Sequence, residues 1–214
     1  MLYWAISVFL ALLAWVYGTE DIAWPGYDCS RLPAPIQGYH PDMTARWVNL
    51  KRNLQVGDSI IVRGRLGPGV LPRKRWFFDL PVGDSRVYLQ AQSTFHFSCQ
   101  YDIGLLYFGR WDGGNWVDWF VAPNPFNAGP FNFRVDVQSD GYSVSKDGVF
   151  LGKYKSNTYS SVNSVYVENF IFEDDNCCDQ EPVCDNLQGN QLSVIIADSR
   201  VQQIRGSCPS ANTW

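Results

Sequence analysis

The sequence predicts an all-β protein, a two-sheet antiparallel sandwich. Residues 131–138 (FNFRVDVQ) alternate apolar and polar side chains, which is typical of a half-buried strand. The pair Asp147-Gly148 stands between two further alternating runs and predicts a tight hairpin. No stretch after residue 18 shows sustained helical periodicity with caps. Closely spaced strands without helices favour a sandwich.

The remaining strands are predicted from short apolar or alternating runs separated by turn signals such as the Gly-Pro-Gly at 67–69. In chain order they are DSIIVRGRL, RWFFDLP, RVYLQAQSTF, IGLLYFG, GYSVSK, GVFLGKYK, SVYVENFIF and LSVIIADSRVQQI. Near the C-terminus, VYVENFIFED and VIIADSRVQQI are both candidates for the strand that closes the sandwich. If the second closes it, the cysteine-rich stretch between them is an insertion rather than a tail.

The N-terminus predicts export. Residues 1–18 form an uninterrupted apolar run that ends at Gly18 and is followed by acidic residues, as in a signal peptide. The alternative is an uncleaved anchor, but the run is short for a membrane span and no basic flank follows it. We therefore expect a secreted, extracellular protein that begins near Thr19 and has no membrane span in the mature chain. Residues 19–45, rich in Pro and Gly, are interpreted as an N-terminal arm.

The cysteines fit an oxidising compartment, because an even set in a secreted chain favours disulfides. The six are Cys29, Cys99, Cys177, Cys178, Cys184 and Cys208. A zinc site would need CxxC pairs with nearby His or Cys partners, and the sequence lacks that spacing. We expect no metal and no cofactor.

Charge and motifs exclude several classes of function. A net charge of −4 and a pI near 5.1 argue against a nucleic-acid partner, which requires a clustered basic face. The acidic stretch EDDNCCDQEPVCD lacks the carboxylate spacing of a calcium loop. FIFEDD lacks the alternating carboxylates of a sandwich-fold glycosidase, and no GxSxG or activated-cysteine pattern is present. We therefore do not expect an enzyme.

Clustered tryptophans point to a binding surface. Trp111, Trp116 and Trp119 are interleaved with Asp, Gly and Asn residues that favour turns and solvent. Rings at a loop edge can bind a ligand by stacking; the alternative is that they pack in the core or support a neighbouring strand.

These segments together resemble the galectin carbohydrate-recognition domain, in order and spacing, over roughly residues 46–174. The motifs that carry the resemblance are LQVGDSIIVRGRL, RWFFDLPVGDSRVYLQAQSTF, DGGNW, NPFNAGPFNFRVDV and DGVFLGKYK. The resemblance implies a jelly-roll-like, concanavalin-like sandwich that binds β-galactosides on its concave face without metal, and so glycan or glycoprotein partners. Residues 175–214 would then be a cysteine-containing extension that could supply the closing strand.

The family's site residues are carried over one by one. The strand pattern with His, Asn and Arg at alternate positions is placed on Gln90, Gln92 and Thr94, and the next strand's Asn near Gly109. The pattern Trp-x-x-Glu-x-Arg becomes Trp116, Trp119 and Val121, respectively. The stacking ring is retained and the charged groups are lost. This predicts weak, calcium-independent glycan binding with relaxed or shifted preference; the alternative is a glycan-independent protein-binding or structural module, with the glutamines as ordinary solvated residues.

The resemblance also bears on the cysteines. The ends of such a domain lie close together, so we expect a Cys29–Cys208 disulfide, with Cys99 paired to one of Cys177, Cys178 and Cys184.

Overall fold

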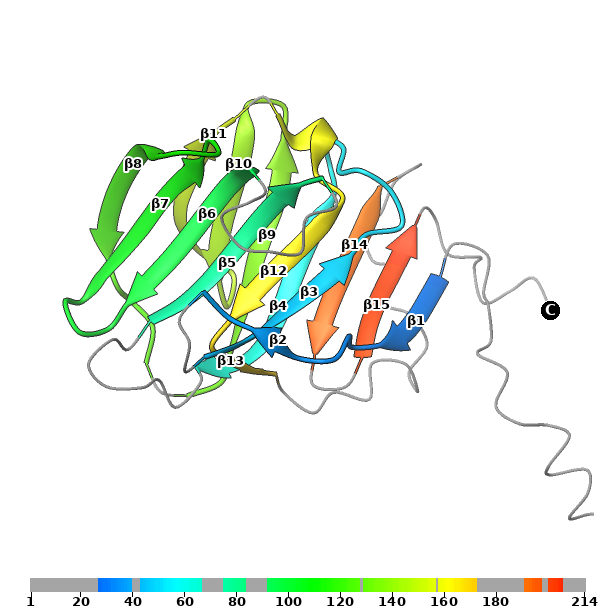
Figure 1. Cartoon of the computed structure of the whole chain (residues 1–214), viewed down its shortest axis with the longest axis horizontal. Helices are drawn as coiled ribbons and strands as arrows, with labels where there is room; N and C mark the ends of the chain where they lie inside the picture. Colours follow the sequence, from blue (N-terminus) through cyan, green and yellow to red (C-terminus); the bar gives the residue numbers. More distant parts are fainter. Residues whose placement is uncertain are drawn as a thin grey trace, which may run out of the picture.

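The computed structural model describes residues 27–39, 43–66, 75–83, 92–127, 129–156, 158–172, 191–197 and 200–205. Within these ranges the chain forms two β-sheets, one in front of the other in Figure 1, and the predicted all-β sandwich is confirmed. Apart from a short 3-10 helix, η1 (Tyr159–Ser161), all the elements in the described ranges are strands. The predicted signal peptide lies outside them.

The front sheet, nearer the viewer in Figure 1, has seven antiparallel strands in the order β2-β3-β12-β5-β6-β7-β8. Their bounds are β2 (Ile36–Gln37), β3 (Thr44–Asn49), β12 (Ser164–Glu168), β5 (Arg75–Val82), β6 (Gln92–Gln100), β7 (Leu105–Trp111) and β8 (Trp116–Pro123). The N-terminal arm therefore ends as edge strands of the fold.

The back sheet has the order β1-β15-β14-β4-β9-β10-β11, with β13 also paired to β4. Its strands are β1 (Tyr27–Arg31), β15 (Arg200–Arg205), β14 (Leu192–Ala197), β4 (Ser59–Leu66), β9 (Phe131–Gln138), β10 (Gly141–Lys146), β11 (Val149–Lys155) and β13 (Phe170–Phe172). The alternation predicted for residues 131–138 is confirmed, because Phe131 and Phe133 are buried while Asn132 and Arg134 are exposed. The Asp147-Gly148 hairpin is confirmed too, with both residues at positive φ.

Aromatic rings fill the space between the sheets. Trp76, fully buried on β5, lies within 5.8 Å, centroid to centroid, of several rings from both sheets. These rings belong to Phe97, Phe126, Phe131, Phe133 and Phe170. The inner faces of the sheets thus form the core, and the outer face of the front sheet is left for other contacts.

Both candidate closing strands close the sandwich, each along a different half of β4. β13 pairs antiparallel with residues 64–66, and β14 pairs parallel with residues 59–62. Leu192, Val194 and Ile196 of β14 belong to the main hydrophobic core. The described residues of the C-terminal extension, β14 and β15, are therefore an integral part of the back sheet (Figure 1).

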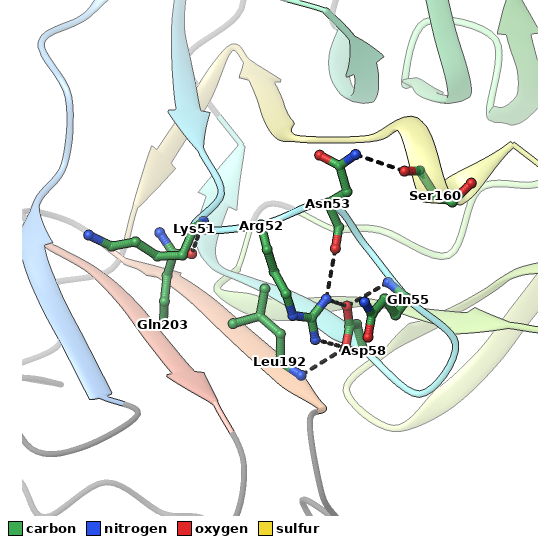
Figure 2. A network of polar contacts seen from close by, with 8 residues as sticks. All are labelled: Lys51, Arg52, Asn53, Gln55, Asp58, Ser160, Leu192 and Gln203. Atoms are coloured by element: carbon green, nitrogen blue, oxygen red, sulfur yellow. Dashed lines mark hydrogen bonds and ion pairs between the residues drawn. The ribbon is translucent and has the colours of Figure 1, made fainter.

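A buried carboxylate joins this extension to the rest of the fold (Figure 2). Asp58, immediately before β4, is fully buried and accepts two hydrogen bonds from the Arg52 guanidinium, at 2.6 and 2.8 Å. Its other contacts are the backbone N–H groups of Gln55 at 2.7 Å and Leu192 at 2.8 Å. The carboxylate thus holds the first residue of β14 in place.

A second contact acts in the same direction. The Gln203 side chain of β15 accepts a hydrogen bond from Lys51 N at 2.9 Å (Figure 2). It also donates one to Asn49 O at 3.1 Å. The segment between β3 and β4 therefore forms hydrogen bonds with both β14 and β15.

The prediction for Cys99 is wrong. Its side chain is a free thiol, fully buried in the core, and burial raises its pKa to about 12. On a strand buried on both sides, the inward position places this thiol among core rings, away from the surface. Cys29 on β1 is disulfide-bonded. The cysteines at 177, 178, 184 and 208 lie outside the described residues, so the Cys29–Cys208 pairing stays a prediction.

Candidate functional site

A continuous row of side chains crosses the outer face of the front sheet. Adjacent strands place Trp47 opposite Tyr166, Tyr166 opposite Asp79, Asp79 opposite His96, and His96 opposite Gly109. Directly paired residues of neighbouring strands point to the same face. We call these five residues, with the ring that lies on Gly109, the outer row.

That ring is the indole of Trp119 on β8. A Cβ added at Gly109 would lie 2.6 Å from its ring, so the absence of a side chain lets the indole rest on the β7 backbone. The Trp119 ring also meets His96 edge-on at 5.7 Å and Tyr107 at 5.9 Å. Its side chain is the exposed end of the outer row.

A β-bulge brings Trp116 and Trp119 to one face. Residues three apart point to opposite faces of a regular strand. Here Phe108 pairs with Phe120 and Arg110 with Val117, so β8 has one more residue than β7 in this interval. Asp118, within the bulge, has φ of 56°, and its carboxylate accepts a hydrogen bond from Arg110 Nε at 2.9 Å. The extra residue reverses the alternation, and both indoles lie on the outer face.

The indoles form a tryptophan platform, which we define as Trp111, Trp116 and Trp119. The Trp116 centroid lies 4.9 Å from Trp111 and 5.3 Å from Trp119, with the rings inclined at 60° and 48°. Trp111 and Trp116 are half-buried, and Trp119 is 40% exposed. The platform therefore offers aromatic surface to solvent.

The loop that carries the platform is held by Asp112. Its Oδ1 accepts backbone N–H groups of Gly114 at 3.0 Å and Asn115 at 2.7 Å, which hold the pKa of this carboxyl below its usual value. Gln92 donates to Asp112 O at 3.1 Å from the neighbouring strand. The turn between β7 and β8 is thus fixed from both sides.

Beneath the platform lies a buried polar group. His96 Nδ1 is 2.8 Å from Asp79 Oδ1, which also accepts the Ser93 hydroxyl at 3.0 Å. The Trp116 ring lies over the imidazole at 4.3 Å, so His96 is only 3% exposed. Asp79 Oδ2 is buried without a hydrogen-bond partner among the described residues. His96 therefore supports the platform from below.

Comparison with known proteins decides the family. A family model described as galactoside-binding lectin matches residues 46–171. The chain belongs to this family. Galactoside-binding lectins bind carbohydrate and are not enzymes. No curated protein sequence matches the chain.

The chain is similar to solved galectin structures. Sheep galectin-11 in complex with glycerol matches with a TM-score of 0.50 and 16% identity, covering 64% of this chain and 90% of its own. The galectin LEC-6 of Caenorhabditis elegans matches with a TM-score of 0.48 and 16% identity, covering 65% of this chain and 86% of its own. The first likeness supports the sandwich.

One of the three residues given to the galectin strand pattern, Thr94, does not lie on the outer face. Thr94 points into the core, where its hydroxyl lies 2.9 Å from the Tyr142 hydroxyl and donates to Leu80 O at 3.2 Å. The pairing of β5 with β6 shifts between Leu80 and Pro81, which leaves Thr94 as an extra residue and breaks the expected alternation. Gln92 is exposed beside the platform loop, and Gln90 lies outside the described residues.

His96, Ser98 and Gln100 fit the galectin pattern better. They alternate along β6, and His96 pairs with Gly109 as the outer row requires. The missed signal was the histidine itself, which matches the first position of the family pattern without substitution. Gly109, Trp116 and Trp119, predicted from sequence, do come together in the galectin domain.

Two further findings concern the described residues of the galectin chain. None of them forms a helix long and apolar enough to cross a membrane. Nor do they bring together three or more His, Cys, Asp or Glu side chains that could hold a metal ion.

Proposed function

We propose that this protein binds glycans weakly and without calcium, through the tryptophan platform, with a preference relaxed or shifted from ordinary β-galactosides. The observation that carries the proposal is the gathering of these indoles on the outer face, with Trp119 40% exposed. An indole face stacks on the apolar C–H face of a sugar ring, and this contact needs no charged partner. Stacking would therefore supply most of the binding free energy.

The polar groups around the platform support weak affinity. Where galectins carry Glu and Arg on this strand, the chain has Trp119 and Val121, which are apolar and exposed. Arg110 is paired with Asp118, and its position between Gly109 and Trp111 on β7 places it on the opposite face from the platform. Neutral groups such as Gln92 would each contribute about 0.5–1.5 kcal/mol to sugar binding. A shifted preference follows from the loss of the charged groups that fix hydroxyl orientation.

A glycan array probed with the full chain tests the proposal. Any glycan selected would then be titrated by calorimetry against Trp116→Ala, with Val149→Ala as a control because Val149 is exposed on a back-sheet hairpin. We expect loss of binding in the first variant and unchanged affinity in the second, in buffer with or without a calcium chelator. Absence of glycan binding by a folded wild-type chain would refute the proposal.

The alternative is a glycan-independent protein-binding module. It is favoured by one observation, the burial of His96 beneath Trp116, which leaves an apolar surface in place of a polar sugar site. Exposed Trp119 and Val121 would then contact a protein partner. A folded chain that binds no glycan on the array would favour this function.

We also propose that the protein is secreted after removal of residues 1–18 and carries disulfides outside the core. The apolar leader and the disulfide at Cys29 support this. The partner proposed for Cys29 is Cys208. Peptide mapping without reduction tests the pairing, and a different partner would overturn it.

A further inference from the structure

We infer that the outer face of the front sheet is open at one end only, so that it accepts the terminal mono- or disaccharide of a glycan and excludes the interior of a longer chain. The inference rests on the proposed glycan binding and names its substrate class. It follows from how exposure changes along the outer row and from what covers the closed end.

Exposure falls sharply from one end of the outer row to the other. Trp119 on β8 is 40% exposed, whereas His96 on β6 is 3% exposed, and Asp79 on β5 and Tyr166 on β12 are 1% exposed. Trp47 on β3 is buried as well. The second sheet packs against the other side of these strands, so it does not account for this burial. The open part of the row therefore lies over β7 and β8.

The chain after β2 covers the closed end. Tyr39 N donates to Glu168 Oε2 at 2.7 Å and to the Tyr166 hydroxyl at 3.2 Å. β2 and β12 are separated by β3, so residues 38–39 must pass over β3 on the outer face to reach these groups. Gly38 lies against the sheet, since a Cβ there would be 2.7 Å from Glu168 Cδ.

Residues 38–39, which we call the wall, are held in place by hydrogen bonds to buried groups. Glu168 is fully buried and accepts the Tyr166 hydroxyl as well as Tyr39 N. Trp47 meets Tyr166 edge-on at 5.9 Å, and Gly38 N donates to Met43 O at 2.8 Å. Lifting residues 38–39 would leave a buried carboxylate without one of its donors, which is costly.

The open part is short. Neighbouring strands lie about 4.8 Å apart, so β7 and β8 together offer a width suited to a terminal sugar and its neighbour. A chain continuing across β5 and β12 would meet the wall at Glu168 and the covered rings of Trp47 and Tyr166. The platform therefore recognises a chain end.

Matched glycans test this directly. The unit selected on the array is presented once at the end of an oligosaccharide and once flanked by sugars on both sides, and both are titrated into the full chain by calorimetry. We expect at least tenfold weaker binding of the flanked form. Equal binding of both forms would overturn the inference and leave the proposed function intact. Failure of both forms would overturn the proposed function together with the inference.

A second measurement locates the ligand. In protein labelled with nitrogen isotope at tryptophan, the indole N–H signals of Trp116 and Trp119 should shift on glycan addition, while that of Trp47 should not. Trp47→Phe, Trp116→Phe and Trp119→Ala each identify one of the three signals. A Trp47 shift as large as that of Trp116 would mean that the glycan reaches the covered end, and would contradict the inference.

Discussion

Replacing Asp58 by Ala should be among the most destabilising single changes in this protein. The substitution removes the acceptor of four hydrogen bonds, two from Arg52 and one each from the N–H groups of Gln55 and Leu192. The Asp58 carboxylate is fully buried, and the Arg52 side chain is 16% exposed, so water can replace few of the lost contacts.

The magnitude follows from this burial. Removing one partner of a buried ion pair costs about 3–5 kcal/mol, and each buried N–H left unpaired costs about 1–3 kcal/mol. Because these contributions overlap, we expect a decrease of about 3–5 kcal/mol in the free energy of unfolding. Asp136→Ala is the matched control, since Asp136 pairs with Arg134 on the surface of β9 and should cost less than about 1 kcal/mol.

Urea denaturation of both variants measures the difference. The midpoint should fall much further for Asp58→Ala than for Asp136→Ala, at an unchanged slope if unfolding stays two-state. If the two variants lose similar stability, Asp58 does not anchor β14, and the strand pairing with β4, the Gln203 contacts and the apolar side chains hold β14 and β15 without it.

Other predictions concern the platform, the buried thiol and the leader. Gly109→Ala should displace the Trp119 indole, because the new methyl would lie 2.6 Å from its ring, and should change tryptophan fluorescence by exposing it; an unchanged spectrum would contradict this placement. Trp119→Ala should weaken glycan binding by about 1–3 kcal/mol without unfolding the chain, as calorimetry and circular dichroism would show, and unchanged affinity would exclude Trp119 from the site. Cys99 should resist thiol reagents until the protein unfolds. Because its pKa is raised from 9.0 to about 12, its contribution to the free energy of unfolding should be constant below pH 9 and fall between pH 9 and 12, where the unfolded thiol loses its proton first; Cys99→Ala removes this dependence. Mass spectrometry of the exported protein should find an N-terminus near Thr19, and an intact Met1 form would refute cleavage.

The sequence predicted best those strands that have one buried face. Residues 131–138 alternate because one side packs in the core and the other meets solvent, and Asp147-Gly148 forms its turn from local backbone preferences. The strand β6 gave no such signal, because almost all its side chains are buried on both faces. The alternation that would have set the register was absent, so the sequence did not show that Thr94 points into the core while His96 lies on the outer face.

Local sequence patterns could not predict the contacts between residues that are far apart in the chain. The bulge at Asp118 depends on pairing with β7, so the shared face of Trp116 and Trp119 could be inferred from family resemblance but not from their spacing. Likewise, nothing near Asp58 in the sequence indicates that its carboxylate binds the N–H of a residue 134 positions later.

The sharing of β4 by β13 and β14 has a consequence for synthesis. β4 emerges from the ribosome early, but its partners on this edge are residues 170–172 and 193–196, which are translated more than a hundred positions later. Until then the edge of β4 presents unpaired N–H and C=O groups, the feature by which strands of separate chains associate. Contacts this distant in sequence also form slowly. The nascent protein should therefore depend on chaperones that shield this edge during translation. Expression at a high level should favour aggregates in which chains associate through β4.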